Sequence, residues 1–89
     1  MDEINNTLAE RGKIYGDYRD VAHRSQLIKT SLRSGKNWNR LVSCQRESLE
    51  MLANKLARIL EGDQMHRDSW HDCVGYMQLV VQYLDDMQE

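Results

Sequence analysis

The segment from residue 68 to residue 84 carries two apolar stripes when its positions are placed at about 100° per residue, the angle of an α-helix. The first stripe consists of Trp70, Cys73, Val74, Met77, Val80, Val81 and Leu84. The second lies nearly opposite and consists of Asp72, Gly75, Tyr76, Leu79 and Tyr83, with Asp68 one turn before it. A helix with apolar surface on two sides packs between other elements or between subunits. Because acids on such a face are costly to bury without a partner, a site is expected here first.

Two further long helices are predicted upstream. Residues 17–32 have an apolar stripe at helical spacing, and Asp17 is a suitable N-cap. This stripe consists of Tyr18, Val21, Ala22, Ser25, Ile28 and Leu32. The next helix is expected to start near Asn39 or Ser43 and to end at Leu60. Its expected buried face consists of Leu49, Leu52, Ala53, Leu56, Ile59 and Leu60.

Glycines and capping residues mark the expected helix ends. Gly35 and Gly62 follow the two helices, at the position where glycine commonly ends a helix. Asp68 is expected to cap the last long helix, which lasts to about Asp86. A short helix is expected over residues 2–10.

The predicted fold is all-α. Residues 1–89 are expected to form one domain, a compact antiparallel bundle of three main helices plus a short N-terminal helix. The chain contains no proline and no phenylalanine, which favours helices because proline breaks helix interiors and strands favour aromatic residues. A core built from 89 residues is modest, so a homo-oligomer is expected.

The net charge of −2 hides a strong segregation of charge. Residues 11–40 contain eight Lys and Arg against two acids, whereas residues 41–89 contain four against nine acids. Generic nucleic-acid binding is not expected, because it usually needs a net basic domain. No signal peptide and no apolar run of about 18 residues is visible, so no membrane role is expected. The two cysteines are expected to be reduced thiols, and the expected location is therefore the cytoplasm.

Pairs of carboxylates recur at helical spacing. Glu47 and Glu50 lie one turn apart on one helix, and Asp68 and Asp72 lie one turn apart on the next. Four acids on facing helices can hold Mg²⁺, which prefers oxygen ligands and commonly keeps water and substrate phosphates. Considered alone, such a charged face is more often solvated and joined by i, i+4 pairs.

Candidate phosphate-binding residues lie beside these acids. Lys55 and Arg58 can engage phosphate oxygens, and Tyr76 of the second stripe is assigned to the same ligand-binding set. Residues 11–18 form a candidate turn in which Arg11 and glycine N–H groups would hold a phosphate while Tyr15 stacks on a base. The alternative, about equally weighted, is a turn that glycine permits and whose tyrosines pack on the bundle.

Several segments together resemble a known family. They are Glu10-Arg11-Gly12, Tyr15-Gly16-Asp17-Tyr18, residues 45–60, Gly62-Asp63, Asp68-Ser69-Trp70-His71-Asp72 and Gly75-Tyr76. The chain thereby resembles small phage and prophage helical proteins related to nucleotide-modification-associated domains and, more distantly, MazG-like all-α nucleotide pyrophosphohydrolases. That remoter resemblance implies a Mg²⁺ site built from an E-x-x-E pair and a later E-x-x-D pair. The pattern fits Glu47, Glu50 and Asp72, but Ser69 stands where the later glutamate belongs.

The first functional hypothesis is therefore a phage-type protein that binds a nucleotide or sequesters a nucleotide-derived host defence signal. An enzyme is less favoured because the carboxylate expected at Ser69 is missing. The nearest substitute, Asp68, lies one position earlier and points about 100° away on the helix. The second hypothesis is a Mg²⁺-dependent, MazG-like nucleoside triphosphate pyrophosphohydrolase, in which metal-bound water attacks a phosphoryl group. The third is a non-catalytic interaction protein whose second stripe is a subunit interface.

Overall fold

The computed structural model describes residues 2–88 and contains four α-helices and one 3₁₀ turn. The elements are α1 (Asp2–Tyr15), α2 (Tyr18–Arg33), η1 (Trp38–Arg40), α3 (Ser43–Glu61) and α4 (Arg67–Met87). No strand occurs in this range, so the prediction of an all-helical chain is confirmed. Within the same range, none of the helices combines the length and the hydropathy needed to cross a bilayer.

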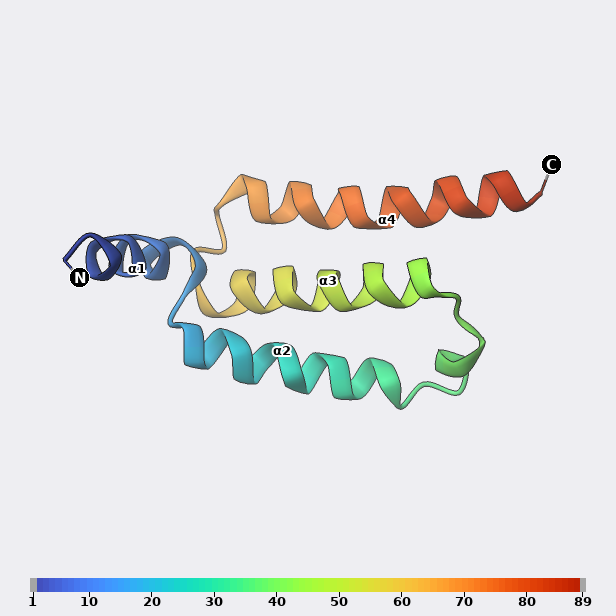
Figure 1. The fold of residues 1–89 in the computed structure, drawn as a ribbon, viewed down its shortest axis with the longest axis horizontal. Helices are drawn as coiled ribbons and strands as arrows, with labels where there is room; N and C mark the ends of the chain where they lie inside the picture. The colour runs from blue at the N-terminus through green and yellow to red at the C-terminus, as the bar shows by residue number, and fades with distance from the viewer. Residues whose placement is uncertain (1, 89) are drawn as a thin grey trace.

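The three longest helices lie side by side, with α3 in the middle (Figure 1). In Figure 1 the chain runs from left to right along α2, back along α3, and from left to right again along α4. Helix α1 extends beyond one end of this layer, which gives the molecule principal extents of 52 × 25 × 25 Å. The central helix therefore supplies one face to α2 and another to α4.

Several predicted helix ends are confirmed. The side chain of Asp17 accepts a hydrogen bond from the Arg19 N–H at 2.9 Å, as an N-cap of α2 should. Gly62 follows the last residue of α3, and its N–H donates to the Arg58 carbonyl at 2.8 Å. Helix α2 ends at Arg33, and Ser34 and Gly35 follow it, where a terminating glycine was expected.

Two predicted boundaries are wrong. Helix α1 does not stop before Arg11 but continues through Gly12 to Tyr15. A single glycine costs a helix only about 1 kcal/mol, so it did not end this one, and the true turn is confined to Gly16 and Asp17. At the start of α4 the N-cap position is His66, and Asp68 instead lies inside the first turn, where the helix dipole favours an acid.

The layer is held together by small side chains. The buried positions of residues 2–88 are Ser25, Ser48, Ala53, Ala57, Ile59 and Ser69. Small residues between helices allow their backbones to approach closely. The expected buried face of α3 is therefore only partly confirmed: Ala53 and Ile59 are buried, whereas Leu60 is 62% exposed.

The α1–α2 turn packs directly against the α3–α4 turn. The Asp63 N–H donates to the Ile14 carbonyl at 2.8 Å. A Cβ atom on Gly62 would lie 2.5 Å from the Ile14 carbonyl oxygen, and one on Gly16 would lie 2.5 Å from the Glu61 carbonyl oxygen. Gly16 also has a φ of +91°, a conformation that glycine adopts readily. This contact between two backbones fixes the end of α1 beside the end of α3.

Candidate functional site

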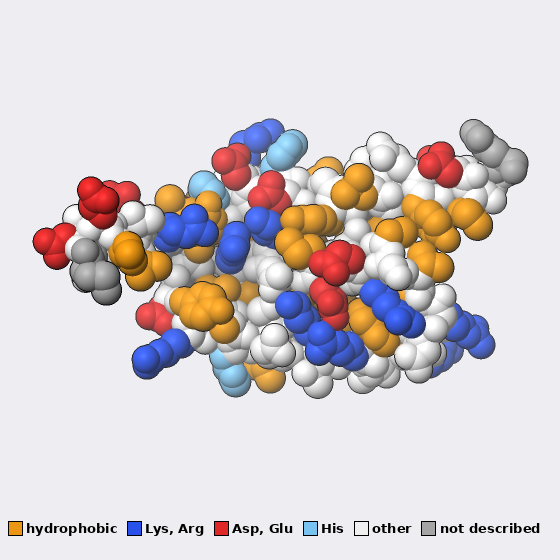
Figure 2. All heavy atoms as spheres, in the orientation of Figure 1, with side chains coloured by type: hydrophobic (Ala, Val, Ile, Leu, Met, Phe, Trp, Pro, Cys, Tyr) orange, Lys and Arg blue, Asp and Glu red, His pale blue; other side chains and the backbone are white. Residues whose placement is uncertain are grey.

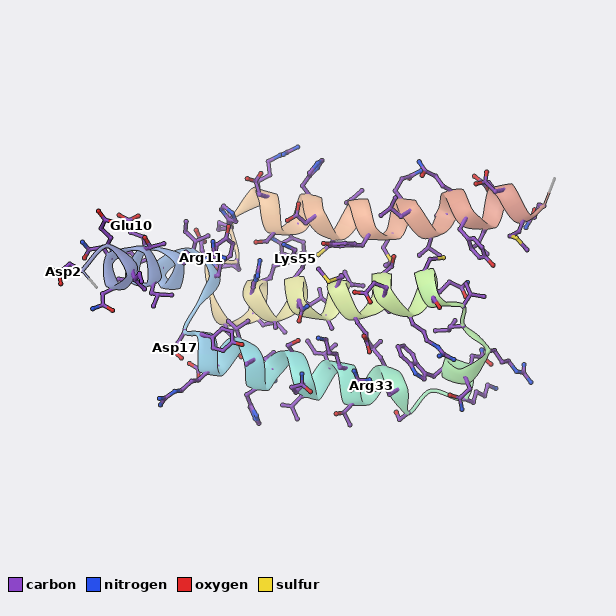
Figure 3. All side chains as sticks on the ribbon, in the orientation of Figure 1. Asp2, Glu10, Arg11, Asp17, Arg33 and Lys55 are labelled. Carbon is purple, nitrogen blue, oxygen red and sulfur yellow. The ribbon has the colours of Figure 1, made fainter. Side chains whose placement is uncertain are left out.

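A hollow of about 790 Å³ opens where α1, α2 and α3 meet. Among the residues that line it, each helix contributes a pair of hydrogen-bonding or charged side chains four positions apart, a spacing that places both on one helix face. These residues are Arg11 and Tyr15 from α1, Ser25 and Lys29 from α2, and Asn54 and Arg58 from α3. Figure 2 shows Lys and Arg side chains gathered where α1 meets the end of α3, and Figure 3 shows Arg11 at that junction.

Tyr15 is contacted by two guanidinium groups. The Cζ atoms of Arg11 and Arg58 each lie 4.9 Å from the centre of its ring. The His66 ring meets the Tyr15 ring edge-on, with their centres 5.6 Å apart. Two positive charges are thus held within about 10 Å of each other, which is one Debye length at 0.1 M salt. A bound anion would relieve the repulsion between them.

The cations of the hollow have no carboxylate partner among residues 2–88. The ion pairs of this range are Arg24–Glu61, Arg33–Glu50 and Lys55–Asp72. Arg11, Lys29 and Arg58 take part in none of them, and Asp17 is the one acid that lines the hollow. The positive charge in the hollow therefore remains available to a ligand.

The hollow also contains neutral polar groups. The buried Ser25 hydroxyl donates to Oδ1 of Asn54 at 2.6 Å, which fixes the orientation of the amide. The amide nitrogen of Asn54 has only a 3.9 Å contact with the sulfur of Met51, so it keeps hydrogen-bonding capacity for a ligand. Tyr18, at the first position of α2, also lines the hollow and is 82% exposed.

The expected cluster of four carboxylates does not form within this chain. Among residues 2–88, no group of three or more His, Cys, Asp or Glu side chains is placed to hold a metal ion. Glu50 accepts from Arg33 of α2 at 2.7 Å, whereas Asp72 pairs with Lys55 of α3 at 3.0 Å. Figure 3 shows Arg33 and Lys55 on different sides of α3. The acids are separated because Glu50 lies on the side of α3 that faces α2, whereas Asp72 belongs to α4 on another side, and the residues present do not fit a single Mg²⁺ site.

The pair between Lys55 and Asp72 affects titration of the acid. The hydrogen bond from Lys55, and then its positive charge, hold the pKa of Asp72 below its ordinary value. The neighbouring Cys73 shows the opposite shift: burial, and then the negative charge of Asp72, raise the pKa of its thiol. Lys55 is thus paired with an acid and does not line the hollow, and its ligand-binding role stays a prediction.

The other predicted site residues are divided between two places. Arg11, Tyr15 and Arg58 line the hollow together. Tyr76 and Glu47 instead line a second, more open hollow of about 490 Å³ between α3 and α4. Asp68 lies exposed in the first turn of α4. The predicted ligand-binding set is therefore brought together only in its Arg11, Tyr15 and Arg58 part.

Sequence reasoning missed the residues that α2 contributes. Ser25 is a polar residue within the apolar stripe of that helix, and Lys29 follows it by one turn. This interruption was the available signal for a polar surface facing α3. One of the two sequence-based alternatives for residues 11–18 used glycine N–H groups to hold a phosphate, but the Gly16 N–H already donates to the Gly12 carbonyl at 2.9 Å. Side chains, not a backbone loop, present the positive charge.

The fold and the hollow define the class: an all-helical protein with a cation-lined hollow at the junction of three helices. Comparison with protein-family models, with curated proteins and with solved structures finds no match to this chain. Function is therefore inferred from the chemistry of the hollow.

Proposed function

We propose that this protein binds a nucleotide, or a small molecule derived from one, through its phosphate groups in the hollow between α1, α2 and α3. The observation that carries the proposal is the set of three cations, Arg11, Lys29 and Arg58, that line one hollow without a carboxylate partner in residues 2–88. Guanidinium groups bind phosphate oxygens through charge-assisted, often bidentate, hydrogen bonds. The proposal assumes that the helices pack as the expected antiparallel bundle.

The size and composition of the hollow favour a nucleotide over inorganic phosphate. A volume of about 790 Å³ lies within the usual range of about 300–1,000 Å³ for small-molecule sites. The exposed ring of Tyr18 offers a stacking surface for a base, and the amide of Asn54 offers hydrogen bonds to a base edge or a sugar. A phosphate ion would use only the cations.

Binding without hydrolysis is the form of the proposal that the charges support. Metal-dependent phosphoryl chemistry needs carboxylates gathered around the ion, and Glu50 and Asp72 are each engaged by a cation on different sides of α3. Sequestration of a nucleotide-derived signal, which the phage-type resemblance implies, needs no such cluster. Release of pyrophosphate from nucleoside triphosphates in the presence of Mg²⁺ would instead favour the enzyme hypothesis.

The test is a thermal-shift screen with ATP, ADP, cyclic dinucleotides, pyrophosphate and adenosine, each with and without Mg²⁺. A ligand that binds the native state raises the melting temperature with its concentration. We expect at least one phosphorylated nucleotide to raise it, and adenosine, which lacks phosphate, to have no effect at the same concentration. If no nucleotide raises the melting temperature, or if adenosine matches ATP, the proposal is wrong.

Variants locate the binding site. Arg58→Gln removes one cation of the hollow, and Lys36→Gln removes an exposed cation in the loop after α2, away from the hollow. We expect the first change to weaken nucleotide binding about 10- to 100-fold, as loss of a charge-assisted hydrogen bond of about 1.5–3 kcal/mol should. The second should leave affinity within about two-fold of the original. Isothermal titration calorimetry measures both, and equal losses in the two variants would indicate nonspecific attraction.

A further inference from the structure

One face of α4 carries an apolar seam that residues 2–88 leave exposed except at the half-buried Met77. The seam consists of Trp70, Val74, Met77, Val81 and Leu84. The intervals between them are four, three, four and three residues, the heptad spacing by which two helices pack along a common seam. Trp70 is 53% exposed, Val74 64%, Val81 47% and Leu84 43%. More than half of the first apolar stripe of this helix is therefore exposed in residues 2–88.

The seam is distinct from the surface by which α4 packs on α3. The inner side of α4 includes the buried Ser69 and the half-buried Cys73, Tyr76 and Val80. At 100° per residue this inner side is centred roughly 90° around the helix from the seam. A partner helix can thus lie along the seam without displacing α3.

Trp70 is already fixed in the position of an anchor. Its indole N–H donates to the Gln64 carbonyl at 2.8 Å although half of the side chain is exposed. The polar atom of the ring would therefore keep its hydrogen bond when a partner covers the apolar surface. An ordered aromatic side chain also loses little conformational freedom on binding, which is typical of residues that dominate interfaces.

Charges at the two ends of α4 indicate what covers the seam. Arg67 in the first turn and Asp85 in the last turn flank the seam on the same side, at about 60° from it. The last turn of α4 has no basic residue, so Asp85 faces the negative end of the helix dipole, which disfavours it. Neither residue belongs to an ion pair within residues 2–88. An antiparallel copy of α4 would bring Arg67 of each helix beside Asp85 of the other.

We propose that the partner is a second copy of this chain, with the two α4 helices packed antiparallel along the seam. A two-fold axis in the interface relates the copies, so the contact closes on itself and forms a dimer. The seam from Trp70 to Leu84 is about 21 Å long at about 1.5 Å per residue. Each α4 presents the same seam, so both partners bury the same apolar surface. This inference does not depend on nucleotide binding.

Sedimentation velocity over a range of protein concentrations tests the seam. We expect the unchanged protein to form dimers and Val74→Glu to weaken the dimer at least ten-fold, because a charge would enter the seam. Leu79→Glu is the matched control: Leu79 is 58% exposed on the same helix but lies on the opposite side from the seam. It should leave the dimer intact. A melting temperature that rises with protein concentration in the control, but not in Val74→Glu, would support the same conclusion.

Charge exchange tests the antiparallel direction. Arg67→Glu and Asp85→Arg each place like charges together in an antiparallel dimer, so each should weaken it about three- to thirty-fold. The double variant carries both changes, restores opposite charges and should return the dimer to near its original strength. A protein that stays monomeric at all concentrations, a dimer that Leu79→Glu disrupts, or a double variant no stronger than the single ones would each overturn the proposal.

Discussion

Gly62 and Gly16 lie so close to neighbouring backbone atoms that neither position has room for a Cβ atom. Their two turns meet backbone to backbone, and a Cβ on Gly62 would lie 2.5 Å from both the Ile14 carbonyl oxygen and the Tyr15 carbonyl carbon. Real Cβ atoms are not found that close to other heavy atoms. The two glycines therefore serve to join α1 to the end of α3, and this contact places Tyr15 beside Arg58.

Gly62→Ala should destabilise the protein by roughly 1–3 kcal/mol, because the opposing backbone must move. Gly75→Ala provides the control: no atom lies within 4 Å of the position of its Cβ, and the residue is inside α4. That change should stabilise the helix by about 0.5–1 kcal/mol. Urea unfolding of the two variants measures both effects. Equal stability in Gly62→Ala and the unchanged protein would contradict the packing described.

The Lys55–Asp72 pair gives a prediction for acid pH. Because the folded-state pKa of Asp72 is lowered, the pair stabilises the fold above the ordinary carboxyl pKa of about 4. This contribution is lost as the pH falls through the lower pKa of the folded state. Asp72→Asn removes it, so the variant should lose less stability than the unchanged protein between pH 6 and pH 3. Asp20→Asn, an exposed acid of α2, is the control for general charge effects.

At the scale of elements, α1 and α3 differ most in how many of their residues are buried. Helix α3 holds four of the buried residues, whereas the described part of α1 holds none. Its apolar side chains Ile4 and Leu8 are more than half exposed. Helix α1 is therefore attached to the layer chiefly through its last turn, at Tyr15 and the backbone contact beside it. Local opening is expected where few apolar contacts are buried.

Amide hydrogen exchange should show this difference. Residues 3–10 should exchange faster than residues 48–58, because the former can open without unfolding the layer. If the hollow binds a nucleotide, saturating ligand should slow exchange at residues 11–15 and leave the last turn of α4 unchanged. Uniform protection along all four helices would contradict the weak attachment of α1. Protection confined to α4 would place the ligand outside the hollow.

For the molecule as a whole, the notable property is how little apolar surface one copy buries. No large side chain is fully buried in residues 2–88, and the buried positions are alanines, serines and one isoleucine. Helices can pack closely through such residues. Because burial contributes about 25 cal/mol per Å² of apolar area, small side chains, which have little area, contribute little free energy. The exposed seam on α4 supplies further apolar surface that a second copy would cover.

Residue patterns predicted the helices well and the site only in part. The helical spacing of apolar residues predicted the all-helical class. Capping residues and glycines predicted the Asp17 cap and the helix end at Gly62, because helix ends depend on neighbours within a few positions. Residue patterns also selected Arg11, Tyr15 and Arg58. The sequence did not show that Lys55 and the acids lie apart from these three residues, because it gives only the angle of a side chain around its own helix. It does not give which neighbour that angle faces.

The order of residues by itself determined which segments coil into helices and which of their faces are apolar, because both follow from contacts along the chain. Only the tertiary structure decided which apolar face is covered. Helix α3 took the side of α4 that includes Ser69 and left Trp70 and its seam exposed. The same placement set Glu50 and Asp72 on different sides of α3 and put Lys29 and Arg58 around the same hollow. Those outcomes depend on how whole helices fit together, through shapes and charges that lie far apart in the sequence.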